Sequence, residues 1–131
     1  MPRRSLITLA ALLALGILDG LWLGAVAKDW YRQGMGALMA EQPRLVPAAL
    51  FYLGYPIGVV FFAALPAGGD LGKALALGAA FGLFCYGTYD LTAWAVLRGY
   101  PGWLAALDIA WGSTVTAVGT LAAAWAARQW G

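Results

Sequence analysis

The stretch LGKALALGAAFGLFCYGTYDLTAWAVL, residues 71–97, decides the class of protein to which this chain belongs. It is long enough to cross the hydrocarbon core of a bilayer as a helix, which takes roughly 20 mostly apolar residues. One acidic residue, Asp90, lies inside it. A carboxylate within a bilayer is costly, and it is comfortable only where it faces the interior of a helix bundle. Asp90 is therefore the first candidate for a functional residue.

The rest of the chain has the same apolar character. Hydrophobic residues make up 63% and charged residues 11% of the 131 residues, whereas soluble domains contain about 45–50% and about 25%. Three further apolar segments, at residues 5–27, 47–65 and 103–127, are long enough to span a membrane. We expect one all-α membrane domain over residues 1–131, an up-down bundle of four transmembrane helices with short loops.

The segment between the first two spans, residues 28–46, is too polar to cross the membrane. Four apolar side chains recur in it at helical spacing: Tyr31, Met35, Leu38 and Met39. This stripe predicts a short interfacial helix that lies on the membrane surface and is ended by Pro43 and Pro47. An irregular loop is the alternative.

Charge and residue usage exclude several functions. The net charge of +2 is spread over single Lys and Arg residues, so we expect no nucleic-acid partner. The chain has no histidine and one cysteine, Cys85, which excludes histidine-ligated haem, histidine-based zinc sites, an intrachain disulfide and a cysteine-ligated iron–sulfur cluster. We therefore expect no cofactor, and the sequence leaves a bound metal open.

Three aspartates define a polar layer inside the expected bundle: Asp19, Asp90 and Asp108. At 1.5 Å per helical residue they lie about 12, about 12 and about 9 Å from the same membrane face, the face of the interfacial helix. Aromatic residues share this half of the spans with them. The candidate binding residues are Asp19, Trp22, Tyr52, Tyr55, Tyr86, Tyr89, Asp90, Trp94, Asp108 and Trp111.

Glycine spacing indicates how the spans pack. Gly16, Gly20 and Gly24 form a G-x-x-x-G-x-x-x-G ridge beside Asp19, and the device recurs as Gly54 with Gly58 and as Gly78 with Gly82. Such ridges are typical of close helix contact in membranes. They predict tight packing that turns the aspartates inward, and they also offer a surface for a homodimer.

The charge of the aspartates has no matching Lys or Arg inside the spans. At least one carboxyl group is then expected to hold a proton at neutral pH. A bound cation, or inward reach by Arg98 or Arg44, is the alternative. A purely structural role, in which the aspartates hydrogen-bond neighbouring helices, also stays open, although such bonds contribute only about 0.6 kcal/mol on average.

Four motifs carry a resemblance over nearly the whole chain: DGLWLG, FYLGYPIG, GLFCYGTYDLT and LDIAWG. In order and spacing they resemble the uncharacterised bacterial four-span membrane protein family known as domain of unknown function 2177. The resemblance implies a multi-pass protein of the bacterial inner membrane and implies no activity. Here Ala93 stands where family members often have Asn. Lys and Arg residues divide equally between the two faces, so orientation depends on the N-terminal Arg pair, which favours cytoplasmic termini.

The polar layer supports three hypotheses about function. The first is binding or transport of a small cationic or proton-coupled solute, because acidic groups with aromatic walls attract organic cations. The second is an accessory or assembly subunit of a larger membrane complex, which suits a small chain with short loops. The third is an intramembrane enzyme acting on a lipid, with the carboxylates as metal ligands or as acid and base. The chain has no histidine and no D-D-x-x-D-type pair of aspartates, which argues against catalysis.

Overall fold

The computed structural model describes residues 3–39 and 44–130, and it shows helices joined by short turns. Four helical stretches are long and apolar enough to cross a membrane: Ile7–Val26, Leu45–Ala64, Leu71–Val96 and Gly102–Gln129. The expected all-α fold with four spans and a short helix between the first two is therefore confirmed. Pro43, expected to end that short helix, lies outside the described residues.

The first two spans each combine an α-helix with a π-helical end. Helix α1 (Arg3–Leu21) continues into η1 (Trp22–Val26), and α3 (Leu45–Val59) continues into η3 (Val60–Ala64). The last two spans are the single helices α4 (Leu71–Val96) and α5 (Gly102–Trp130). Pro47 does not stop a helix as expected but lies in the first turn of α3, where backbone N–H groups have no helical acceptor.

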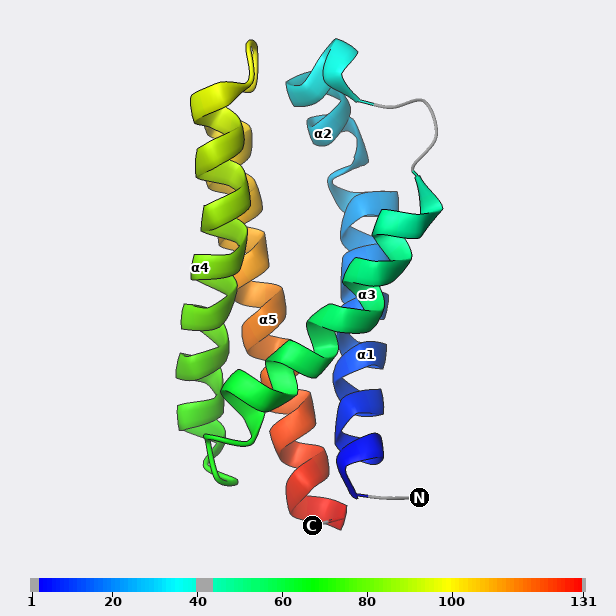
Figure 1. Ribbon diagram of the computed structural model, residues 1–131, viewed down its shortest axis with the longest axis vertical. Coiled ribbons are helices and arrows are strands. Elements are labelled where there is room, and N and C mark those ends of the chain that lie inside the picture. The colour runs from blue at the N-terminus through cyan, green and yellow to red at the C-terminus, as the bar shows by residue number, and fades with distance from the viewer. Residues whose placement is uncertain (1–2, 40–43, 131) are drawn as a thin grey trace.

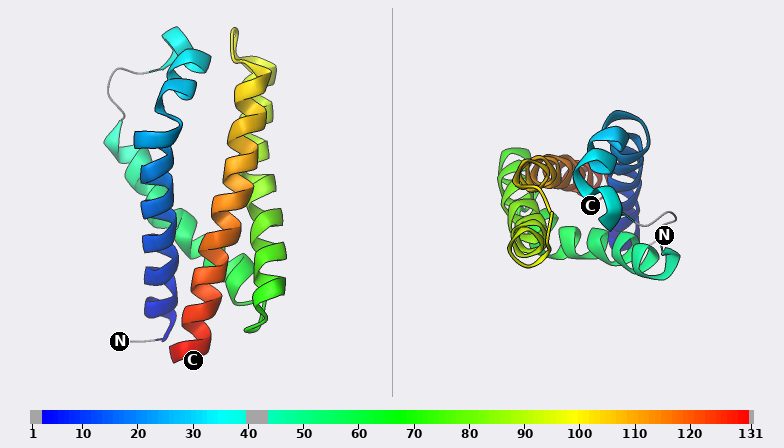
Figure 2. Two further views of the ribbon diagram at one scale, coloured as in Figure 1. Left: turned by 180° about the vertical axis from the view of Figure 1, so that it is seen from behind. Right: turned by 90° about the horizontal axis from the view of Figure 1, so that it is seen from above.

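The spans alternate in direction, so α1 begins and α5 ends at the same end of the bundle (Figure 1). Helix α5 packs against both α1 and α4. Helix α3 crosses the bundle obliquely, starting beside α1, while η3 at its end packs against α4 and α5 (Figures 1 and 2). The oblique path brings side chains of α3 next to α1 at the level of Asp19.

Small residues allow the close approach of α4 and α5, as the spacing of Gly78 and Gly82 predicts. A Cβ atom on Gly82 would collide with the Gly112 carbonyl and the Thr116 side chain. A Cβ atom on Gly78 would lie 2.9 Å from the Ala117 Cα atom. Two long helices therefore meet almost backbone to backbone, which fixes the depth at which their polar residues face each other.

The ridge on α1 does not pack within the bundle, so that expectation is wrong. At Gly16, Gly20 and Gly24 no atom of another helix lies within 4 Å of the position a Cβ atom would take, and all three residues are exposed. Gly54 is open in the same way. The glycine spacing shows that another helix could pack closely against this ridge, but it does not show which helix, if any, does so.

The short helix α2 (Lys28–Met35) packs at the end of the α4–α5 hairpin where the turn joins the two helices. Tyr31 and Met35 pack there with Leu104, as the predicted apolar stripe requires. The stripe is wrong beyond Met35. Gly36, with φ of 51°, ends the helix, so Leu38 and Met39 follow a different course and are exposed.

Candidate functional site

All three intramembrane aspartates are buried. Their exposed fractions are 7% for Asp19, 0% for Asp90 and 9% for Asp108. They come from three helices, α1, α4 and α5, and their hydrogen-bond donors are aromatic side chains. The expectation that the aspartates face the bundle interior is therefore correct.

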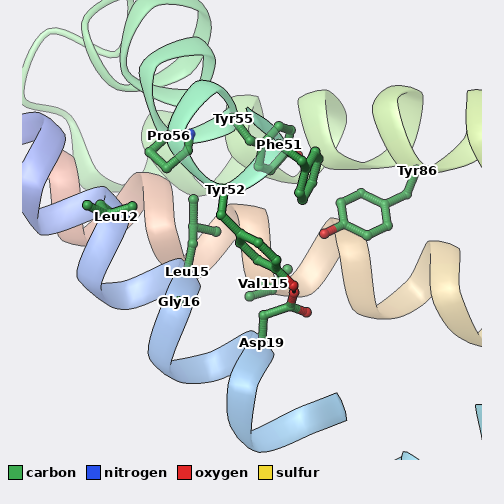
Figure 3. A pocket seen from close by; sticks show the side chains of 10 residues that line it. All are labelled: Leu12, Leu15, Gly16, Asp19, Phe51, Tyr52, Tyr55, Pro56, Tyr86 and Val115. Atoms are coloured by element: carbon green, nitrogen blue, oxygen red, sulfur yellow. The ribbon is translucent and has the colours of Figure 1, made fainter. Parts of the chain in front are cut away.

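Asp19 is held by two donors from two other helices. The Tyr52 hydroxyl of α3 donates to Oδ2 of Asp19, and the Trp111 indole of α5 donates to Oδ1 over 2.9 Å. Figure 3 shows the Tyr52 ring reaching down to the carboxylate, with the Tyr86 hydroxyl pointing toward the same place. Neutral donors satisfy the hydrogen bonds of a carboxylate without cancelling its charge.

Asp108 is linked to Asp19 through an aromatic stack. The Tyr31 hydroxyl donates to Oδ1 of Asp108 over 2.5 Å, and the Trp22 indole donates to the Tyr31 oxygen over 3.1 Å. The Trp22 ring stacks on Trp111, with centroids 4.4 Å apart and planes within 5°. Helix α2 is thus tied to the polar layer, because its Tyr31 is the donor that Asp108 uses.

Asp90 has the most enclosed carboxyl group of the three. Its Oδ1 accepts a hydrogen bond of 2.8 Å from the hydroxyl of Tyr100, in the turn between α4 and α5. Its Oδ2 is buried and has no hydrogen-bond partner. The carboxyl group of Asp108 lies within hydrogen-bonding reach of Asp90 across the α4–α5 contact. Two carboxylates cannot bond to each other unless one of them carries a proton.

A cavity of about 250 Å³ opens beside this network. It is lined by Asp19, Leu23, Phe51, Cys85, Tyr86, Tyr89 and Asp108. Two carboxylates and three aromatic rings therefore face one space, and no Lys or Arg is among the lining residues. Cavities that hold drug-sized ligands start at about 300 Å³, so this one suits a smaller molecule.

All the predicted binding residues except Trp94 lie in or beside this network. Tyr55 lines a small pocket with Asp19 and Tyr52 (Figure 3), and its ring packs edge-on against Tyr86. Tyr55 hydrogen-bonds Thr116 over 2.7 Å rather than an aspartate. Trp94 is 53% exposed and packs over Gly102, away from the cavity. Residues four apart share a helix face, but Trp94 lies one turn nearer the end of α4 than Asp90, where its ring lies against Gly102 at the start of α5.

Sequence reasoning missed two residues of the network, Tyr31 and Tyr100. The sequence pattern places Tyr31 in an apolar stripe and Tyr100 in a turn that contains glycine and proline. The available signal was that both stand at the membrane face nearest the aspartates. Such tyrosines hydrogen-bond inward when an acceptor is within reach.

Neither arginine predicted as an alternative partner serves the aspartates. Arg44 and Arg98 are exposed, and the donors to the carboxylates in the described part of the chain are Tyr and Trp side chains. Among residues 3–39 and 44–130, no three Cys, Asp or Glu side chains lie together in a group that could hold a metal ion. The three aspartates are thus arranged as a pair, Asp90 with Asp108, and a separate Asp19.

The two tyrosines at the membrane face predict how stability depends on pH. Burial, and then the hydrogen bond to Asp108 or Asp90, raise the pKa of Tyr31 and of Tyr100 above 10. In the unfolded chain these tyrosines have a pKa of about 10, so above pH 10 they ionise in the unfolded state but stay neutral in the folded state. The free energy of unfolding is therefore constant below pH 10 and falls above it. We expect melting temperatures in detergent to fall between pH 9.5 and pH 11, as about one and a half kcal/mol is lost per tyrosine at pH 11. Tyr31→Phe should flatten this dependence, and an equally steep fall in that variant would contradict the assignment.

Fold and site together define a multi-pass helical membrane protein with a buried network of acidic and aromatic side chains. The family described as Predicted membrane protein (DUF2177) matches residues 5–125, and the chain belongs to this family. No curated protein and no solved structure shows significant similarity to the chain. The match extends into all four spans and includes every residue of the network.

Proposed function

We propose that this protein binds a small organic cation in the cavity between Asp19 and Asp108, and that it transports this solute or a proton-coupled relative of it. The observation that carries the proposal is the pairing of two buried carboxylates with one open cavity that no basic side chain lines. A positive ligand would offset the charge that the chain itself leaves unmatched.

The aromatic walls favour an organic cation over a bare metal ion. Phe51, Tyr86 and Tyr89 face the cavity, and ring faces attract ammonium groups by about 0.5–2 kcal/mol each, most when water is excluded. Leu23 adds an apolar surface that would contact alkyl groups. The described residues offer no group of three metal ligands.

Binding of tetraethylammonium to the purified protein in detergent tests the proposal. We expect Asp108→Asn to weaken binding at least about tenfold, because about 1.4 kcal/mol of charge attraction is enough for that change. Asp29→Asn, in the exposed first turn of α2, is the matched control and should bind as the wild type does. Equal affinity in the wild type, Asp19→Asn and Asp108→Asn would rule out the cavity as a cation site. Flux into proteoliposomes then separates transport from binding alone.

An accessory or assembly role is the second candidate, and the open ridge on α1 favours it. Gly16, Gly20 and Gly24 face outward with nothing against them, and such stripes let another helix approach closely. The partner would be a second copy or a subunit of a larger membrane complex. Isolation from native membranes as a stable lone species would count against this role. We further propose a bacterial inner-membrane location with both termini in the cytoplasm, which reporter fusions at each end would test.

A further inference from the structure

We propose that Asp90 and Asp108 form a proton-binding site in which one proton is shared between the two carboxyl groups, and that a cation entering the cavity displaces this proton. The shared proton is independent of the proposed function, whereas the displacement rests on it. The site lies at the close contact of α4 and α5, and the cavity reaches it through Asp108.

The hydrogen bonds of Asp90 require this proton. Asp90 is fully buried, its Oδ1 accepts from Tyr100, and its Oδ2 has no partner. A buried carboxylate with an unsatisfied oxygen beside a second carboxylate is strongly disfavoured. One proton changes this arrangement into an O–H···O hydrogen bond between the two groups and leaves one negative charge on the pair.

Within residues 3–39 and 44–130, the titratable groups that act on Asp90 include no Lys or Arg. The titratable groups that act on Asp90 are Asp108 on α5, Tyr100 in the turn, Tyr89 on α4 itself and Tyr31 on α2. All four are acids, so none of them can neutralise the pair as a lysine or arginine would. A proton or a ligand cation must do so.

Asp108 is the residue that connects the proton to the ligand. It faces Asp90 on one side, and it lines the cavity together with Asp19. When a cation binds beside Asp108, release of the shared proton to water leaves two carboxylates and one cation. The pair and its ligand then carry the same net charge as the protonated pair did, so the exchange is balanced.

Two measurements on the intact protein in detergent test the two parts separately. The first is the infrared carbonyl-stretch band of a protonated carboxylic acid at neutral pH. We expect this band in the wild type and in Asp29→Asn, and we expect Asp90→Asn to lose it. The second is proton release on addition of tetraethylammonium in weak buffer, where we expect about one proton per bound cation in the wild type and none in Asp90→Asn.

Each outcome decides one part. Absence of the acid band from the wild type, or its persistence in Asp90→Asn, overturns the shared proton whether or not cations bind. A band with cation binding but no proton release overturns the exchange and leaves the proposed function standing. A band without any cation binding overturns the proposed function and the exchange together, and it supports the proton site. A band with stoichiometric release supports both parts.

Discussion

Asp19→Asn is expected to lower the melting temperature by several degrees, whereas Asp90→Asn leaves it unchanged or raises it. Asp19 accepts from the Trp111 indole and the Tyr52 hydroxyl. An asparagine side chain has one oxygen, and the indole N–H of Trp111 would donate to it. The Tyr52 hydroxyl would then face the NH2 group of the asparagine, which is a donor, and would have no acceptor. Loss of a buried acceptor costs about 1–3 kcal/mol, which amounts to several degrees for a chain of this size.

The substitution of asparagine for Asp90 has the opposite effect, because the surroundings of Asp90 can use an amide donor. The asparagine oxygen can still accept from Tyr100, while its amide group supplies the hydrogen that the shared proton provides in the wild type. The variant therefore imitates the protonated acid and removes the need for a bound proton. The measurement is thermal unfolding in detergent at neutral pH, with Asp29→Asn as the control for the loss of one exposed carboxylate.

A loss of several degrees in Asp90→Asn, equal to that in Asp19→Asn, would contradict this asymmetry. The polar layer would then be a structural network throughout, and the accessory-subunit role would become the better account. Unchanged or higher stability in Asp90→Asn indicates instead that the carboxyl group is kept at a cost to the fold, as a functional site is.

The fold could be predicted from the sequence because length and hydropathy alone determine the number of spans. The level of the aspartates could be predicted as well, since alternating helices of known rise place Asp19, Asp90 and Asp108 at one depth. What could not be predicted is which partner each residue finds. Trp22 stacks on Trp111 at the point where the chain turns π-helical, and no residue pattern in the sequence indicates that turn.

The oblique course of α3 could not be predicted from the sequence either. The α1 ridge has the spacing of a packing surface, but α3 meets α1 beside it and leaves Gly16 and Gly20 open. Tyr52 reaches Asp19 as a result of this crossing. A glycine repeat reports that two helices can approach closely, whereas crossing angles follow from every side chain at the contact.

Gly82→Ala should unfold the α4–α5 hairpin at a markedly lower temperature, whereas Gly87→Ala on the same helix should not. At Gly82 the new methyl group would collide with the Gly112 carbonyl and the Thr116 side chain, and overpacking of this kind costs about 1–3 kcal/mol. At Gly87 nothing lies within 4 Å, so alanine should stabilise the helix by about 1 kcal/mol. Thermal unfolding in detergent gives both values. Equal stability of the two variants would show that α4 and α5 are not in backbone contact. The proposed pairing of Asp90 with Asp108 depends on that contact, so it would then be wrong as well.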